Sequence, residues 1–388
     1  MNKSFVSKIR FKGFNEFYYK TTFSKFYNKA KSGGTPSTKN KDFYNGEISF
    51  LSIKDVTNQG KYIFETEKTI TRKGLKNSSA WLVPKNSLIY SIYASVGFPT
   101  INKIPLATSQ AFFSMEINNL YFSTEYLYYL LLKFKKKELN KYIIKQTQPN
   151  LSKEIINQFI FKIPNLQEQT KIAHFFSIID RKIELIKEQL SLLEKQKQYY
   201  LNNMFANEKS YPNIRFKGFN DEWKSKKIGE ILNYQQPTKF IIKDKIEIRG
   251  KIPVLTANKS FILGYVNEKN IYENIPVIIF DDFTMDMKYV NFKFMVKSSA
   301  IKILKSKNNN INLFYVFNLL KNLKLFSSDH KRYYISYVSE INVLFPNINE
   351  QTKVAHFFTI IDRKIELVKE QLSLLEKQKQ YYLNNMFI

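Results

Sequence analysis

The stretch KIELIKEQLSLLEKQKQYYLNNMF runs from Lys182 to Phe205 and occurs again from Lys364 to Phe387, with Val368 in place of Ile186 as the single difference. The similarity extends further toward the N-terminal side, since segments 168–205 and 350–387 are identical at 35 of 38 positions. Chance does not produce a match of this length, so the chain contains an internal duplication.

A second, shorter repeat marks the beginning of each copy. The heptapeptide IRFKGFN occurs at 9–15 and again at 214–220, and a PN[LI]xEQT sequence leads into each long repeat. The chain is therefore interpreted as two copies of one unit. We predict a first globular domain, a helical region, a linker, a second globular domain and a second helical region, with boundaries at 1–163, 164–206, 207–213, 214–345 and 346–388.

The long repeat has the pattern of a coiled-coil helix. Its apolar positions alternate steps of four and three, with Lys197 as the polar interruption. No Pro or Gly occurs within 168–205, so we predict one unbroken helix of about 57 Å at 1.5 Å per residue. Pairing with its own duplicate would give an intramolecular coiled coil that separates the two domains. The predicted seam consists of Ile179, Ile183, Ile186, Leu190 and Leu193 with Ile361, Ile365, Val368, Leu372 and Leu375.

The two globular stretches, 14–163 and 219–345, differ in sequence but agree in order. Each contains short β-branched and aromatic runs broken by turn residues, for example SLIYSIY in the first and PVIIF in the second. Each then has a helical segment, FSTEYLYYLLLKF or NLFYVFNLLKNLKLF, and a short strand before a proline. We interpret them as one α/β (α+β) fold used twice.

The formal net charge of +28 is typical of a protein that binds a polyanion, most often nucleic acid. A compositional bias is the competing explanation, because 54 residues are lysine and only seven are arginine. Segments 168–205 and 350–387 each carry six basic and five acidic residues. The excess charge is therefore concentrated in the globular domains, which favours a binding surface there.

Several classes of function are excluded or disfavoured by composition. The chain has no cysteine and only three histidines, which excludes disulfides, thiolate catalysis and a cysteine-based zinc site. The first residues lack the apolar region of a signal peptide, and the longest apolar runs are too short to span a bilayer. We expect a soluble, cytoplasmic protein without a membrane partner.

The whole chain resembles the specificity subunit of type I restriction-modification enzymes. The resemblance rests on SGGTPST at 32–38, on PVLTANKSFILGYVNEKN and PVIIFDDFTMDMKYVNFKF in the second domain, and on EQTK[IV]AHFF at the start of both helices. It implies an antiparallel helical spacer and two target-recognition domains, each reading half of a bipartite site in double-stranded DNA. It also implies two modification subunits that methylate adenine and restriction subunits with translocase and nuclease activity.

Under this resemblance the chain itself is not an enzyme and holds no cofactor. S-adenosylmethionine, ATP and Mg²⁺ would belong to the partner subunits. In agreement, the sequence has no G-x-G-x-x-G, no P-loop and no Pro-Pro dipeptide of the kind found in adenine methyltransferase motifs. His174 and His356, at equivalent helix positions, are interpreted as packed or partner-facing residues.

Two other functions remain open from the sequence. A stand-alone metal-dependent endonuclease would use Asp281, Asp282, Asp286 and Lys288, since clustered carboxylates near a lysine can hold a divalent metal. The same residues fit a strand, a polar turn and a second strand. The other alternative is a non-catalytic coiled-coil scaffold that carries basic domains.

Candidate DNA contacts fall into three groups. The paired glycines of SGGTPST allow positive φ and would leave backbone N–H groups free to hold a phosphate. Lysines and arginines in polar stretches are candidates for phosphate neutralisation, and two amide side chains are candidates for reading an adenine edge. The loop residues are Ser32, Gly33, Gly34 and Thr35; the basic residues are Lys39, Lys41, Lys54, Arg72, Lys73, Lys239, Lys243, Lys245 and Lys259; the amides are Gln110 and Asn258.

Overall fold

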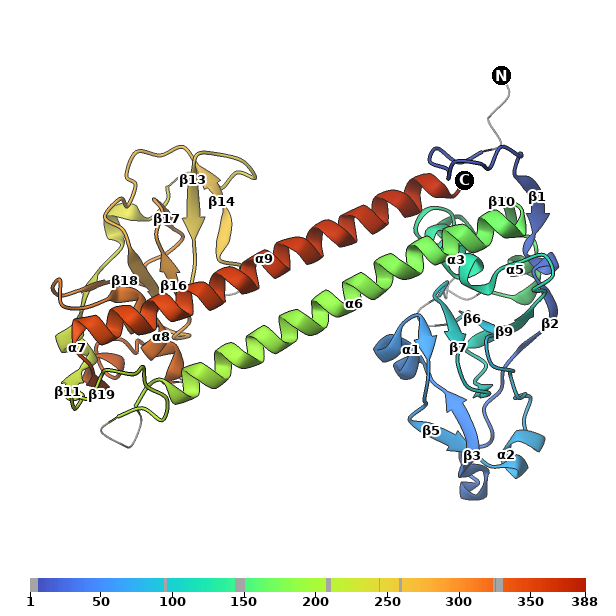
Figure 1. Ribbon diagram of the computed structural model, residues 1–388, viewed down its shortest axis with the longest axis horizontal. Coiled ribbons are helices and arrows are strands. Elements are labelled where there is room, and N and C mark those ends of the chain that lie inside the picture. The colour runs from blue at the N-terminus through green and yellow to red at the C-terminus, as the bar shows by residue number, and fades with distance from the viewer. Residues whose placement is uncertain are drawn as a thin grey trace. The chain divides into compact units, whose positions relative to one another are not determined.

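The computed structural model describes residues 6–93, 96–143, 151–206, 211–243, 245–257, 260–323, 325 and 331–388. The chain divides into two compact units, which are described separately (Figure 1). Unit 1 comprises Met1–Ile186 and Gln371–Ile388, and unit 2 comprises Lys187–Glu370. Each unit thus contains one globular domain and parts of both long helices, α6 (Leu166–Asn203) and α9 (Ile348–Met386).

Unit 1 is a mixed α/β domain. Its main sheet has the strand order β2-β9-β6-β7-β4, a second sheet has the order β5-β3-β8, and β1 pairs with β10. The strands are β1 (Tyr19–Thr22), β2 (Tyr27–Ser32), β3 (Tyr44–Leu51), β4 (Tyr62–Ile63), β5 (Lys68–Ile70), β6 (Leu88–Ser91), β7 (Pro99–Asn102), β8 (Ala107–Thr108), β9 (Phe112–Ile117) and β10 (Ile160–Ile163). The helices are α1 (Ile53–Gln59), α2 (Arg72–Lys76), α3 (Thr124–Lys137), α4 (Asn140–Ile143) and α5 (Lys153–Asn157), with 3-10 turns η1 (Phe23–Lys25) and η2 (Lys41–Phe43).

Unit 2 repeats most of this topology, with a four-stranded main sheet in place of the five-stranded one. Its sheets have the orders β12-β18-β15-β16 and β14-β13-β17, and β11 pairs with β19. The strands are β11 (Lys224–Lys227), β12 (Leu232–Gln235), β13 (Ile252–Leu255), β14 (Ile262–Val266), β15 (Val277–Asp281), β16 (Met287–Val290), β17 (Met295–Val296), β18 (Ile301–Ser306) and β19 (Asn342–Phe345). The helices are α7 (Ile228–Ile231) and α8 (Leu313–Asn322), with 3-10 turns η3 (Thr238–Phe240) and η4 (Val338–Glu340).

The two three-stranded sheets show the correspondence most directly. In unit 1 the central strand β3 pairs antiparallel with β5 and parallel with β8, and in unit 2 the central strand β13 pairs antiparallel with β14 and parallel with β17. In both units a helix then precedes the last strand and the long helix. The predicted fold class, one α/β domain used twice together with two long helices, is confirmed.

The PNxxEQ sequence before each long helix has a structural reason. In unit 1 the Asn165 side chain accepts a hydrogen bond from the Glu168 backbone N–H at 2.9 Å. Glu168 is fully buried, and its two carboxylate oxygens accept hydrogen bonds from Nε and Nη2 of Arg10, at 2.8 and 2.7 Å. Gln169 accepts from the Ser123 backbone N–H at the start of α3 and donates to the Pro164 carbonyl. The motif therefore ties α6 to both α3 and the IRFKGFN segment.

Unit 2 makes the same contacts with the second copies of these motifs. Glu350 binds the Arg215 guanidinium at 2.7 and 2.8 Å, and the Asn347 side chain accepts from the Glu350 N–H. The Gln351 side chain accepts a hydrogen bond from the backbone N–H of Asn312, the residue at the start of α8, and donates one to the Pro346 carbonyl. The two repeated motifs, IRFKGFN and PNxxEQ, thus bind each other through one buried contact, which occurs once in each unit.

The long helices pair in opposite directions. Within unit 1, Asp180 near the start of α6 forms an ion pair with Lys379 near the end of α9, at 2.6 Å. Within unit 2, Asp362 near the start of α9 pairs with Lys197, and Lys369 pairs with Glu194 at 2.7 Å. The antiparallel coiled coil is confirmed, and Lys197, the interruption in the apolar seam, is explained by its carboxylate partner.

The predicted seam is buried along only part of its length. Its isoleucines and Val368 are 6–8% exposed, whereas the four leucines are half-buried. The buried positions are Ile179, Ile183, Ile186, Ile361, Ile365 and Val368, and the half-buried ones are Leu190, Leu193, Leu372 and Leu375. Two helices alone do not fully cover a leucine seam, and near their ends each globular domain adds further cover, as where Phe176 packs against Tyr129 at 4.9 Å.

Candidate nucleic-acid interface

The glycines of the SGGTPST loop are required by packing. The Gly33 N–H donates to the Phe112 carbonyl at 3.1 Å, and the Gly34 N–H donates to the Thr108 carbonyl at 2.9 Å. A Cβ on either glycine would lie 2.0 Å from a neighbouring oxygen, and neither has positive φ. The expectation that the N–H groups of these glycines are free to hold a phosphate was wrong, because the turn is closed against β8 and β9.

The same loop brings together two of the predicted contact residues. The exposed Thr35 hydroxyl donates to the exposed Gln110 side-chain oxygen at 2.6 Å, although the residues are 75 positions apart. Ser32 ends β2 beside them and is exposed. Thr35 and Gln110 therefore form one polar surface, and their contact with DNA stays a prediction.

The basic residues of unit 1 differ in their surroundings. Arg72 pairs with Glu47 at 2.9 Å, Lys73 with Asp42 at 3.2 Å, and Lys54 with Glu67 at 2.7 Å. Exposed pairs of this kind are worth about 0–1 kcal/mol, so a phosphate can replace the carboxylate. Lys39 and Lys41 are exposed and form no ion pair with a described residue, which makes them the stronger candidates of the five.

Lys41 lies close to Arg72 and Lys73. It belongs to η2, and the carbonyl of the next residue, Asp42, accepts a hydrogen bond from Thr71, the residue before α2. The Tyr44 hydroxyl donates to the Pro36 carbonyl and so connects this region to the SGGTPST loop. The structure thus brings together most of the candidates predicted in the first domain, with Lys54 on the separate helix α1.

In unit 2 the predicted lysines follow one segment. Lys239 lies in η3, and Lys243 and Lys245 follow it; all three are exposed, and none forms an ion pair with a described residue. The segment is held by the Ile242 N–H, which donates to the Val296 carbonyl, and by the Lys243 N–H, which donates to Glu268. Asn258 and Lys259 lie outside the described residues.

Two of the aspartates considered for metal catalysis, Asp281 and Asp282, instead bind other groups of the same domain. Asp281 ends β15 and accepts from the backbone N–H groups of Phe283 and Thr284. Asp282 is buried, accepts from the Tyr334 N–H at 2.8 Å and forms an ion pair with buried Lys302 at 3.4 Å. The described residues contain no group of three or more His, Asp or Glu side chains that could hold a metal ion. The strand, turn and strand interpretation is confirmed as the β15–β16 hairpin.

A buried polar network in unit 1 was not predicted. Lys61 donates to the Tyr129 hydroxyl at 2.8 Å, and Tyr129 donates to Asp180 on α6 at 2.6 Å. Burial is the main cause that raises the pKa of Tyr129 above its ordinary value, and Asp180 raises it further; burial lowers the pKa of Lys61. The network fixes α3 to the helix pair, and no spacing in the sequence indicates it.

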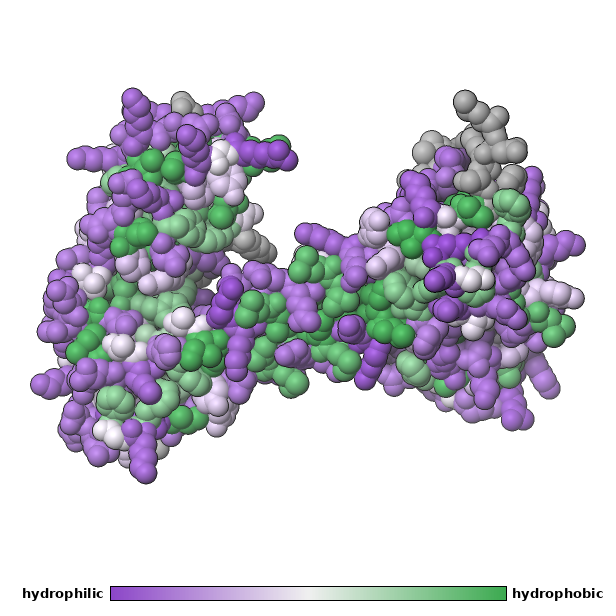
Figure 2. All heavy atoms as spheres, turned by 45° about the horizontal axis from the view of Figure 1, so that its top comes forward, coloured by the Kyte–Doolittle hydropathy of each residue, from purple (hydrophilic) through white to green (hydrophobic). Residues whose placement is uncertain are grey.

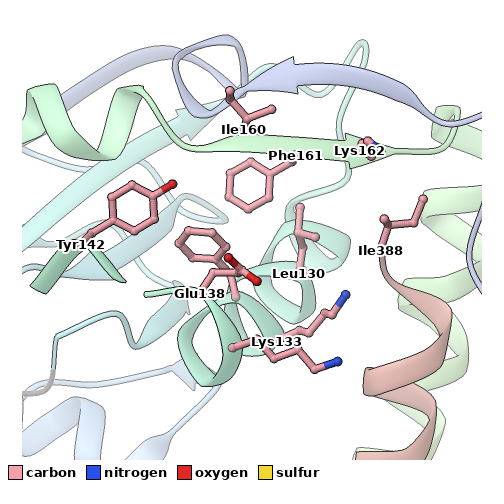
Figure 3. Close-up of a pocket in the computed structure, with 10 residues that line it drawn as sticks. Leu130, Lys133, Glu138, Tyr142, Ile160, Phe161, Lys162 and Ile388 are labelled. Atoms are coloured by element: carbon pink, nitrogen blue, oxygen red, sulfur yellow. The ribbon is translucent and has the colours of Figure 1, made fainter. Parts of the chain in front are cut away.

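Unit 1 also has a cavity of about 390 Å³ between α3 and β10 (Figure 3). Leu130, Phe161 and Ile388 give it an apolar lining, and Lys133 lies at one side. The Lys133 ammonium donates to the Phe387 carbonyl at 2.8 Å, and burial lowers its pKa to about 8. This lysine therefore holds the end of α9 against the domain at an electrostatic cost.

An apolar pattern outside the seam was also missed. Ile178, Leu185, Leu192 and Tyr199 on α6 are seven residues apart and remain 46–65% exposed. On α9 the equivalent residues Ile360, Leu367, Leu374 and Tyr381 are 45–66% exposed. Hydrophobic residues are accordingly visible on the surface of the two helices in Figure 2. The seven-residue spacing in the printed sequence was a sufficient signal for this pattern.

Comparison with known proteins identifies the family. The model of the type I restriction modification DNA specificity domain matches residues 20–195 and 220–377, which are the two globular domains and most of both helices. The chain belongs to this family. It therefore carries two type I DNA specificity domains, one in each unit, as the resemblance of the sequence motifs implied.

Individual proteins that are similar in sequence to this chain are also specificity subunits. The Escherichia coli EcoR124I/EcoR124II specificity subunit is 39% identical over 193 residues, which are 46% of this chain and 47% of that protein. The Methanocaldococcus jannaschii MjaIX specificity subunit is 30% identical over 319 residues, or 78% of this chain and 71% of that protein. This chain thus matches about half the length of the first relative and more of the second.

A solved structure has the same fold as this specificity-domain chain. The type I restriction-modification S subunit from M. genitalium aligns over 99% of both chains with a TM-score of 0.68 and 17% sequence identity. Among the described residues, no helix is long and apolar enough to cross a membrane.

Proposed function

We propose that this chain is the DNA-recognition subunit of a type I restriction-modification complex and performs no catalysis itself. Each globular domain reads one half of a bipartite DNA site. The long helices bind two adenine-methylating modification subunits and set the number of unread base pairs between the half-sites. Restriction subunits join this complex in the cytoplasm, and S-adenosylmethionine, ATP and Mg²⁺ act in the partner subunits.

The observation that carries the proposal is the exposed apolar pattern, which occurs once in each unit. Unit 1 contains Ile178 and Leu185 from α6 with Leu374 and Tyr381 from α9. Unit 2 contains the equivalent set, Ile360 and Leu367 from α9 with Leu192 and Tyr199 from α6. We call these sets patch 1 and patch 2. Two equivalent patches in one chain suit two copies of the same protein partner.

Helix geometry places the residues of each patch on one side of the helix pair. At 3.6 residues per turn they lie about 130° around the helix from the middle of the seam, on one flank. The ion pair between Glu194 and Lys369 joins the opposite flanks of the two helices in unit 2. In an antiparallel pair the like flanks of both helices face the same side. Within each unit the residues of its patch therefore form a strip on one side of the two helices, and in unit 2 this is the side away from the ion pair.

The energetics favour a partner on this strip. Fully burying a Leu, Ile or similar side chain is worth about 1.5–3 kcal/mol. Covering four side chains that are half exposed would therefore contribute about 4 kcal/mol per patch. Since the helical segments are nearly neutral while the domains are basic, protein contact on the helices and DNA contact on the domains are compatible on one chain.

The test is to block one patch at a time. Leu185→Glu alters patch 1 and Leu367→Glu alters patch 2 at the equivalent position. We expect the unaltered chain to bind two modification subunits, each single variant one, and the double variant none, as measured by native mass spectrometry of the co-purified complex. Ser191→Glu adds the same charge at an exposed position outside the strip and is the matched control.

Two results would contradict the proposal. A saturated complex with one modification subunit per chain would remove the argument from two patches, and full binding by the double variant would show that the strip is not the contact. DNA reading is tested separately by replacing 14–163 with the domain of another family member. One half of the methylated motif should then change, and a change in both halves would contradict one domain per half-site.

A further inference from the structure

The second recognition domain presents one aliphatic side chain to solvent almost completely. Ile248 is 93% exposed, more than any other large apolar side chain of the described residues. Ile262 and Leu263 on the neighbouring strand β14 are 44% and 39% exposed. A single exposed apolar residue needs no explanation, but three exposed aliphatic side chains on neighbouring segments of a basic domain call for an occupant.

The backbone beneath Ile248 is fixed. Glu247 and Tyr265 exchange two backbone hydrogen bonds, each 2.9 Å long. Ile246 packs so closely over Gly264 that a Cβ there would lie 2.3 Å from the isoleucine methyl group. The Ile248 side chain therefore projects from a segment anchored on β14.

Cations flank this side chain on both sides in sequence. Lys243, Lys245, Arg249 and Lys251 are exposed, and none forms an ion pair with a described residue. In Figure 2 the part of unit 2 that carries β13 and β14 in Figure 1 is mostly hydrophilic, with a few hydrophobic side chains between. The cations outnumber the one described carboxylate of this segment, Glu247, and an apolar tip in a cationic segment is complementary to duplex DNA, in which phosphates surround stacked, apolar base faces.

We propose that Ile248 inserts between two base pairs from the minor groove of the half-site bound by the second domain, while the flanking cations bind the adjacent phosphates. Aliphatic wedges of this kind partly unstack a base step and bend the duplex, so the wedge favours sequences that unstack easily. The inference rests on the proposed function, since it assigns a contact to that DNA.

The corresponding region of the first domain lacks this feature. The segment from the SGGTPST loop to the start of β3, residues 32–44, contains no exposed large apolar side chain. Its candidate contacts, Thr35, Lys39, Lys41 and Gln110, are all polar. The proposal therefore predicts an asymmetric complex in which one half-site is distorted at a base step and the other is read without this distortion.

The experiment uses the full complex with modification subunits and a duplex containing the methylation site mapped for that complex. The fluorescent adenine analogue 2-aminopurine, whose emission rises on unstacking, is placed in turn at each position of both half-sites except the methylated adenines and their immediate neighbours, because a methyltransferase turns its target base out of the stack and would raise the emission in both half-sites. We expect a rise in one half-site only. Ile248→Ala should abolish the rise and weaken binding about tenfold, Ile248→Leu should retain both, and the salt dependence of binding should stay unchanged because no cation is removed.

Leu120→Ala removes an aliphatic side chain that is 79% exposed in unit 1 and is the matched control, with no effect expected. Binding by Ile248→Ala within twofold of the unaltered complex, or an unchanged fluorescence rise, would overturn the inference and leave the proposed function intact. Failure of the unaltered complex to bind its site specifically would overturn the proposed function and the inference with it.

Discussion

The buried contact between Arg10 and Glu168 offers a quantitative test of why the sequence repeats IRFKGFN. The Glu168 side chain is 1% exposed and the Arg10 side chain 14% exposed, and the two form paired hydrogen bonds. Arg10→Met keeps most of the side-chain volume and removes the guanidinium. The variant leaves a buried carboxylate with only the Tyr18 hydroxyl, at 3.3 Å, and the start of α6 as polar support.

Removing one partner of a buried ion pair costs about 3–5 kcal/mol, because the other charge is left without compensation. The N-terminal end of α6 offsets about 0.3–1 kcal/mol of this through its dipole. We therefore expect unit 1 to lose about 3 kcal/mol. With a urea m-value of about 1–3 kcal/mol per molar, the unfolding midpoint of unit 1 falls by about 1 M or more.

The chain has two tryptophans, Trp81 in unit 1 and Trp223 in unit 2, so each unit can be followed alone. In a Trp223→Phe background, Trp81 fluorescence in urea reports the unfolding of unit 1. Glu168→Gln combined with Arg10→Met should recover much of the loss, because the double variant buries no uncompensated charge. A cost below about 1 kcal/mol for Arg10→Met, the range of exposed pairs, would refute the reasoning.

Three further predictions follow from other features. Lys133→Met should stabilise unit 1 by about 1–3 kcal/mol at pH 7, because burial lowers the pKa of Lys133 to about 8 while the unfolded value is near 10.5. The cost of burying the charged lysine is present below pH 8 and is lost as the pH rises toward 10.5. The urea midpoints of the variant and the unaltered protein should therefore converge between pH 7 and 9.5, and a constant difference would contradict this. Gly33→Ala should lower the thermal midpoint of the chain, because the new Cβ would lie 2.0 Å from the Thr108 carbonyl oxygen. Gly13→Ala is the milder comparison, since its Cβ meets no atom within 4 Å and the positive φ is its only strain. Equal midpoints for the two variants would contradict the packing role of Gly33. Inserting one heptad after Leu190 and one after Leu372 adds about 10 Å to each helix, which equals about three base pairs of DNA. This change should lengthen the unread spacer of the methylated motif or abolish activity on the original site. An unchanged motif with full activity would show that the helices do not set the spacing.

The sequence was most informative where a pattern is written twice. The seam isoleucines repeat at steps of four and three, so both long helices could be predicted, and the structure begins them at Leu166 and Ile348 rather than at Glu168 and Glu350. Several strands and the helices α3 and α8 could be predicted because apolar runs and turns are local features, whereas the short helices α1, α2 and α5 were not predicted. The part of the topology that the two domains share, including the three-stranded sheets β5-β3-β8 and β14-β13-β17, agrees with the similar order of runs in the two sequences.

Contacts between distant residues could not be predicted in this way. Thr35 and Gln110 are 75 positions apart, and nothing local indicates that they meet. The glycines of SGGTPST suggested free N–H groups because the sequence does not show that β8 and β9 supply carbonyl partners and close packing. Asp282 was included in a possible metal site for the same reason, since its partners, the Tyr334 backbone N–H and Lys302, lie elsewhere in the chain.

The end of each long helix contacts a copy of IRFKGFN in the same manner. The Ile214 N–H donates to the Asn203 carbonyl in unit 2, and the Ile9 N–H donates to the Asn385 carbonyl in unit 1. In unit 2 a short peptide connects these partners, whereas in unit 1 they belong to opposite ends of the sequence. The packing is the same at both junctions. A gene that joins the end of α9 to the first IRFKGFN copy, and that begins at the second copy instead, would therefore encode the same set of contacts in a different order.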